Sequence, residues 1–163
     1  MPIKFTILGC GSSFGIPRID GYFGNCNPKE NKNYRTRCSA LISTKNTSTL
    51  IDTSPDIKIQ LLKNKINNID RVLYSHFHAD QTHGINELRL FYLKKRDKIP
   101  IYANQSTKKY LLSSFKYCFK NTIEYPSILK MNSLKKVHFF KDKKIKISIR
   151  TIKVKHGAVE SMA

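Results

Sequence analysis

Three of the chain's five histidines fall between positions 76 and 83, directly after a short apolar segment typical of a β-strand. Residues 75–84 read Ser-His-Phe-His-Ala-Asp-Gln-Thr-His-Gly. Side chains two positions apart in an extended segment point to the same side, so His76 and His78 face one way and Asp80 continues the spacing. Packing in a core explains a lone histidine but not such a cluster. The sequence therefore predicts a metal site where this strand ends.

A divalent ion bound there would lower the pKa of a bound water toward about 7 and make hydroxide available at neutral pH. Asp80 can supply an oxygen ligand or hold that water, so it is the candidate catalytic residue. The cluster therefore predicts metal-dependent hydrolysis rather than simple packing.

Strands mixed with helices along the chain indicate an α/β domain. We expect strands at 3–9, 38–43, 49–52, 71–75, 99–103, 137–140 and 145–155, a long loop at 20–37, and helices at 54–64, 85–95 and 106–115. Ser54 is the expected N-cap of the first helix, because Pro55 follows it at the first helical position. Leu62 lies at core spacing in that helix. Neither a repeat nor a linker divides the chain, so residues 1–163 are expected to form a single domain.

Composition excludes several classes of protein. No stretch approaches the roughly 18 apolar residues of a membrane span, and the first residues lack the apolar segment of a signal peptide. The four cysteines lie far apart and form no Cys-x-x-Cys pair, which disfavours a disulfide scaffold. We therefore expect a cytoplasmic protein with no membrane partner. The net charge of +19 is compatible with a nucleic-acid partner, but the lysines are spread along the chain and do not favour one.

The motif His76-x-His78-x-Asp80, followed by Gly84, resembles the signature of the metallo-β-lactamase fold superfamily. Three further segments resemble its first strand with glycine loop, its aspartate-bearing strand and a later histidine-bearing strand: Leu8–Ser13, Leu50–Thr53 and Val154–Gly157. Residues 11–17, 35–39 and 83–89 look like a bacterial branch related to the cyclic-phosphate phosphodiesterases of phosphonate breakdown. The resemblance covers essentially the whole chain and implies an α/β fold, the four-layer αββα sandwich.

The resemblance also implies roles for individual residues. His76, His78 and His156 would bind a first metal ion and Asp80 a second, with Asp52 as a supporting carboxylate. Zn²⁺ or Mn²⁺ is expected, as one or two ions, because imidazole suits zinc and carboxylate ligation admits manganese. Hydroxide at the metal would then attack the phosphorus of a small phosphorylated metabolite. The implied function is that of a phosphodiesterase.

Two departures from the family pattern qualify this expectation. Gln81 stands where the family usually has a histidine ligand of the second metal, which weakens that site. We assign Gln81, His83 and Arg89 to substrate or supporting roles, Arg89 because guanidinium matches phosphate oxygens. The family's bridging aspartate and last histidine follow the position of His156, yet the chain ends at Ala163. We therefore expect only the N-terminal part of the sandwich, with an incomplete second half, from a longer protein, and an inactive fragment when it is alone.

Two alternatives stay open at this stage. One is an endoribonuclease of the same fold, like the enzymes that process tRNA 3′ ends, which the +19 charge favours and the segment 83–89 disfavours. The other is a non-catalytic remnant or binding domain, for which Gln81 would be a sign of lost chemistry. A second copy of the chain, giving a homodimer, is also retained as a candidate partner.

Overall fold

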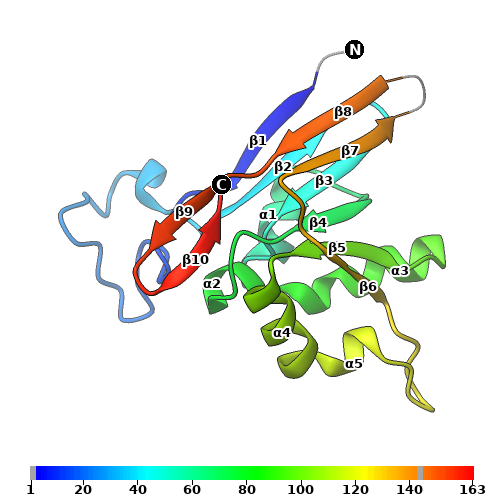
Figure 1. Cartoon of the computed structure of the whole chain (residues 1–163). Helices are drawn as coiled ribbons and strands as arrows, with labels where there is room; N and C mark the ends of the chain where they lie inside the picture. Colours follow the sequence, from blue (N-terminus) through cyan, green and yellow to red (C-terminus); the bar gives the residue numbers. More distant parts are fainter. Residues whose placement is uncertain (1–2, 143–144) are drawn as a thin grey trace.

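A six-stranded mixed sheet organises the computed structural model, which describes residues 3–142 and 145–163 (Figure 1). Its strands follow one another in space as they do in sequence: β1 (Lys4–Gly9), β2 (Ser39–Ser43), β3 (Ser48–Ile51), β4 (Arg71–Leu73), β5 (Ile99–Ala103) and β6 (Leu129–Ser133). The first three strands pair antiparallel, and β3 to β6 pair parallel. The expected hairpin of β2 and β3 is confirmed. The turn between them keeps Leu41 opposite Leu50, both buried.

Helices connect the parallel strands, because a parallel pair requires a crossover. They are α1 (Ile57–Lys63), α2 (Ala79–Thr82), the 3-10 turn η2 (Ile85–Leu88), α3 (Arg89–Lys95), α4 (Gln105–Ser114) and α5 (Lys116–Phe119). The long segment between β1 and β2 is irregular except for the 3-10 turn η1 (Asn31–Asn33), as expected. Within the described residues, the helices are all too short or too polar to cross a membrane.

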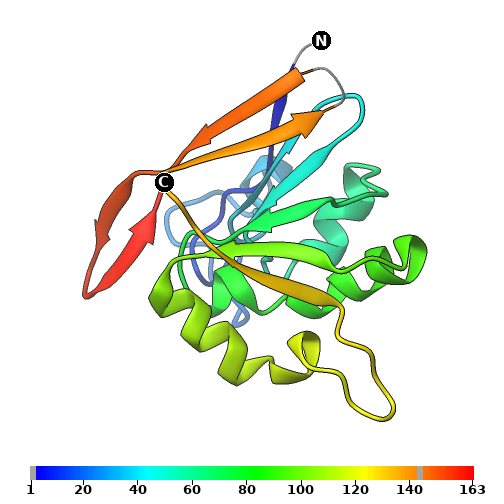
Figure 2. The ribbon, with the colours of Figure 1, turned by 45° about the vertical axis from the view of Figure 1, so that its right-hand side comes forward.

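The sheet is covered on both faces at β5 (Figure 2). Ile99, Ile101 and Ala103 alternate along this strand, are buried and belong to the main apolar core, which also contains Leu111 of α4. Tyr102 points to the opposite face, toward the hairpin of β7 (Val137–Asp142) and β8 (Ile145–Arg150). Its ring contacts His138 and Phe140 edge-on, with centroids 4.9 and 5.5 Å apart. The chain therefore stacks a helical layer, a sheet and a second β layer, which confirms the predicted fold class.

Several predicted boundaries are corrected by local hydrogen bonds. The first helix begins at Ile57 instead of Ser54, whose hydroxyl accepts a hydrogen bond from the Asp56 amide in a turn before the helix. Leu62 was expected in the core, but it is 71% exposed because this short helix turns it outward. The third helix is capped by Asn104 rather than Ser106, since the Asn104 side chain accepts from the Thr107 amide.

Four elements were not predicted at all: α2, β6, α5 and β10 (Val159–Met162). The predicted strand 145–155 is two strands, β8 and β9 (Lys153–His156). Each of the missed elements is only four or five residues long, which is too short to show a periodic apolar pattern.

Gly84 packs the segment after α2 directly against the turn before α1. Its amide donates to Thr53 O at 2.9 Å. A Cβ atom at this position would lie 2.1 Å from Ser54 O and 2.7 Å from Ile57 Cγ2. The clash involves backbone, so it cannot be relieved by rotating a side chain.

We therefore expect Gly84→Ala to lower the free energy of unfolding by about 3 kcal/mol, the upper end of overpacking costs. Urea unfolding followed by circular dichroism measures it. Gly24→Ala is the matched control, because a Cβ there meets nothing within 4 Å and adds only the strain of a positive φ of 62°, a cost of about 1 kcal/mol. Equal losses in the two variants would contradict the close-packing argument.

Candidate metal centre

The candidate site lies at the edge of the sheet where the parallel strands β3 and β4 end. Ile51 pairs with Leu73, so the residues that follow each strand emerge side by side. Asp52 follows β3, and Ser75 and His76 follow β4. Ligand sites in open α/β sheets form outside the carboxyl ends of such strands. The topology therefore brings the aspartate-bearing strand next to the histidine motif.

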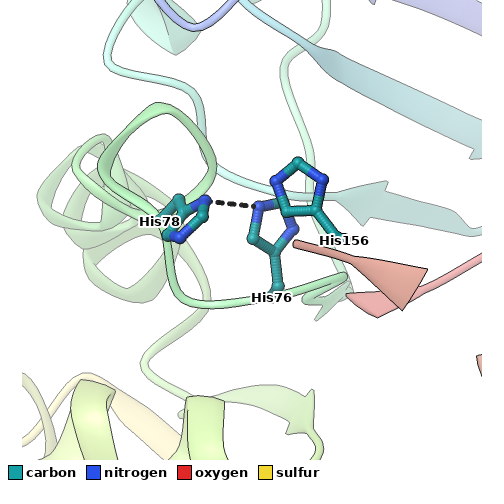
Figure 3. A group of neighbouring side chains, drawn as sticks. All are labelled: His76, His78 and His156. Atoms are coloured by element: carbon teal, nitrogen blue, oxygen red, sulfur yellow. Dashed lines mark hydrogen bonds between the residues drawn. The ribbon is translucent and has the colours of Figure 1, made fainter. Parts of the chain in front are cut away.

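A third histidine reaches this edge from the far end of the chain. The hairpin of β9 and β10 carries His156, which pairs with Val159. The Met162 amide donates to Ser75 O at 3.0 Å and so joins the hairpin to the end of β4. Figure 3 shows His156 beside His76, with His78 on the loop that leads into α2.

The three imidazoles form one compact group. One ring nitrogen from each of His76, His78 and His156 lies within 4.8 Å of the others. His76 Nε2 and His78 Nδ1 are 3.2 Å apart (Figure 3). Two nitrogens bound to one tetrahedral zinc ion lie about 3.3 Å apart, given Zn–N bonds near 2.0–2.1 Å. The donor set and its spacing therefore fit a divalent metal ion.

The surroundings of His76 keep its ring neutral. Burial lowers the pKa of His76, and the neighbouring imidazoles of His78 and His156 lower it further, while Asp80 opposes the shift. A neutral imidazole retains the lone pair that a metal needs. His76 is buried, His78 half-buried and His156 exposed, so the group is open to solvent on one side.

A chain of hydrogen bonds orients His76 from behind. Asp52 accepts from the Ser75 amide at 2.8 Å and from the Ser75 hydroxyl at 2.7 Å. The Ser75 hydroxyl also lies 3.0 Å from His76 Nδ1, and the Ser161 hydroxyl lies 3.4 Å from the same atom. With Nδ1 engaged, Nε2 is left facing the other imidazoles. Hydrogen-bonded partners of this kind fix the orientation of metal-binding histidines.

Sequence reasoning missed both serines. Ser75 precedes the first histidine of the motif, but its contact with Asp52 follows from the register between β3 and β4, which the sequence does not display. Ser161 is 85 residues from His76 in the chain. Asp52, which the resemblance implies as a supporting carboxylate, contacts Ser75, whose hydroxyl lies beside His76.

Burial raises the pKa of Asp52 to about 7, against the opposing effect of its two bonds from Ser75. Below pH 3.8 this carboxyl is protonated in both the folded and unfolded states. Between pH 3.8 and 7 the unfolded chain ionises while the folded protein keeps its proton. Unfolding then releases a proton, so the contribution of Asp52 to stability falls as the pH rises through this window.

In the presence of a chelator, the unmodified protein should therefore lose a few kcal/mol of stability as the pH rises from 4 to 7. Asp52→Asn should not show this loss. Urea unfolding at several pH values measures the difference between the variant and the unmodified protein. Asp70→Asn serves as an opposite control. The pKa of Asp70 is lowered by its bonds from Lys95, Ser48 and Asn68, which outweigh desolvation. That variant should lose stability at pH 7 and little at pH 3. Parallel curves for the unmodified protein and Asp52→Asn would contradict the shift.

Asp80 is held by its neighbour and lies outside the group of three histidines. One orientation of the Gln81 amide gives both its oxygen and its nitrogen suitable hydrogen-bond partners. In that orientation the nitrogen donates to the two Asp80 carboxylate oxygens at 2.7 and 2.8 Å. Gln81, where the family usually has histidine, thus contacts the expected ligand of a second ion. The backbone of Gln81 is also fixed, because its carbonyl accepts from the Thr53 amide at 2.7 Å.

The other two predicted residues point elsewhere. His83 is exposed, its Nδ1 lies 3.1 Å from the Thr82 hydroxyl, and its ring contacts Phe115 edge-on. Arg89 stacks on Tyr125 at the start of α3. In the described residues neither one joins the histidine group.

Three clustered histidines at the carboxyl edge of a layered α/β sheet are the features that the comparisons with known proteins address. The family model described as "Beta-lactamase superfamily domain" matches residues 47–162, and the chain belongs to this family. The match, together with the solved structures below, confirms the metallo-β-lactamase fold that the sequence motif implied.

Three known proteins are similar over most of the chain. A solved structure described as a new diphosphatase from the PhnP family is 28% identical, with a TM-score of 0.82 over 99% of this chain and 61% of that chain. Zinc-bound PqqB from Methylobacterium extorquens is 17% identical, with a TM-score of 0.64 over 92% of this chain and 52% of that one. An octanoyltransferase of Porphyromonas gingivalis (strain ATCC BAA-308 / W83) is 31% identical over 135 residues, which are 82% of this chain and 27% of the relative. The chain thus spans about a quarter of the curated relative and less than two thirds of either solved structure.

Proposed function

We propose that the protein is a metal-dependent hydrolase, most specifically a phosphodiesterase acting on a small phosphorylated metabolite. The observation that carries the proposal is the group of His76, His78 and His156, whose ligand nitrogens lie within 4.8 Å of one another. The likeness to a diphosphatase of the PhnP family supports phosphate chemistry, because that structure covers 99% of this chain at 28% identity.

In this proposal, the three histidines hold Zn²⁺ or Mn²⁺, which supplies Lewis acidity for activating water and polarising a phosphoryl oxygen. Asp52 and Ser75 orient the His76 ring, and burial keeps that ring neutral. The Asp80 carboxylate is fixed by Gln81 beside the histidine motif and accepts the proton of the attacking water. The exposed His156 leaves the site open to solvent, so substrate approaches from the side of the β9–β10 hairpin.

The protein should bind one zinc ion tightly, and His156→Ala should weaken that affinity by about 100-fold or more, because one of three protein ligands is lost. A second ion should bind much more weakly, since Gln81 engages Asp80. Competition with a chromogenic chelator measures both affinities. His83→Ala is the matched control, because His83 contacts Phe115 instead of the other histidines. Unchanged zinc affinity in His156→Ala, or two equally tight ions, would overturn this assignment.

The protein should hydrolyse bis(p-nitrophenyl) phosphate with Zn²⁺ or Mn²⁺ and lose this activity in excess chelator. Asp80→Asn should lower kcat by about 100-fold or more, as expected for a residue that handles the proton of the nucleophile. Asp97→Asn, at an exposed position beyond α3, should leave kcat unchanged. Full turnover in chelator would refute a metal mechanism.

An endoribonuclease is the second candidate, and the net charge of +19 is the observation that favours it. Cleavage of a precursor tRNA in preference to the small diester would identify this function. Binding of that RNA should then weaken steeply with salt, because each phosphate contact releases counterions.

A further inference from the structure

A cavity of about 400 Å³ lies in the helical layer, between η2, α5 and the loop that follows α5. Its walls include Asn86, Arg89, Tyr117, Tyr125 and Ile128. None of the three clustered histidines lines it. Figure 1 shows α5 and the following yellow loop on the helical side of the sheet, whereas the β9–β10 hairpin lies at the other end of the molecule. The volume is that of a small-molecule site.

The cavity presents a positive charge with free donors. The Arg89 guanidinium carbon lies 4.4 Å from the centre of the Tyr125 ring, and its Nη1 donates to the Tyr125 hydroxyl at 2.7 Å. Among the described residues, Arg89 makes no ion pair, and no acidic side chain lines the cavity. A guanidinium carries five N–H donors. One bond to Tyr125 therefore leaves an edge available for a bidentate contact with a carboxylate or phosphate.

The same walls present aromatic surface. Tyr117 and Tyr125 are each about two fifths exposed, so parts of both rings face solvent. The Tyr117 hydroxyl donates to Asn86 Oδ1, which fixes its ring between α5 and η2. Burial raises the pKa of Tyr117 to about 12, so this donor stays protonated at neutral pH. Ile128 is buried and provides an apolar wall.

We propose that this cavity binds a small planar ring that carries an anionic group, with the ring against Tyr117 and Tyr125 and the anion on Arg89. A nucleoside monophosphate and an aromatic carboxylate share this chemistry. The site is separate from the metal centre of the proposed function, and its ligand is bound rather than hydrolysed, because no metal-binding histidine lines the cavity.

Isothermal titration calorimetry at pH 8 tests the cavity. Excess chelator is present so that phosphate groups cannot bind to a metal ion at the histidines. AMP and 2-naphthoate are the two ring-bearing anions, adenosine is the neutral ring, and inorganic phosphate is the anion without a ring. We expect AMP, 2-naphthoate or both to bind at least tenfold more tightly than adenosine and than phosphate. Binding of AMP alone identifies a nucleotide site, and binding of both identifies a general site for aromatic anions.

Arg89→Gln should weaken binding of the ring-bearing anion by about tenfold or more, the value of a charged hydrogen bond, and leave adenosine unchanged. Arg89→Lys should retain part of the affinity, since it keeps the charge without the planar fork. Arg150→Gln is the matched control, because Arg150 is an exposed residue of β8 that lies outside the cavity. Circular dichroism checks that each variant is folded.

Three results would overturn the proposal. The first is the absence of binding by either ring-bearing anion at millimolar concentration in the unmodified protein. The second is equal affinity for phosphate and AMP, which would show that the rings take no part. The third is unchanged affinity in a folded Arg89→Gln variant. None of these bears on hydrolysis at the histidines, so the two proposals fail independently.

Discussion

The bond between a buried carboxylate and one serine holds the candidate site together. Ser75 has all three of its polar groups engaged: its amide and hydroxyl donate to Asp52, and its carbonyl accepts from the Met162 amide. The first two contacts join the end of β3 to the end of β4. The third attaches the hairpin that carries His156. Ser75 and Asp52 therefore help to bring together three histidines from distant segments, together with the Ser161 hydroxyl near His76.

Burial of the Asp52 carboxylate costs free energy in the protein alone, but it favours the binding of a cation nearby. Among the described residues, two donors of Ser75 face the buried Asp52 side chain. The pKa of Asp52 rises to about 7 because its charged form is poorly solvated. A positive charge at the neighbouring histidines would stabilise the ionised carboxylate and lower that pKa again. The histidine ring responds in the complementary way, since burial disfavours its protonated form. On the proposed function, the lowered pKa of His76 favours the neutral imidazole that a metal requires. The raised pKa of Asp52 disfavours its anion until a cation binds nearby.

Features governed by short-range periodicity were predictable from the sequence. The spacing of His76 and His78 placed both rings on one side, and their nitrogens are indeed 3.2 Å apart. The β2–β3 hairpin and the layered α/β class were likewise predicted. The helix start was misplaced, because Ser54 closes a turn before α1 instead of capping it. Short-range patterns identified most of the longer elements but not how each one begins, and they missed the shortest ones.

Long-range contacts decide the rest, and the sequence does not display them. Gln81 was read only as a missing histidine, yet its amide contacts Asp80, which alters what that carboxylate can bind. The sequence predicts a substrate or supporting role for Arg89, because a guanidinium group matches phosphate oxygens. Its partner Tyr125 is 36 residues away, and the loop after α5 must fold back on α3 before the two meet. Because that contact turns the guanidinium into the cavity beside α5, the stretch from His76 to Arg89 reaches two separate places, the carboxyl edge of the sheet and the helical layer.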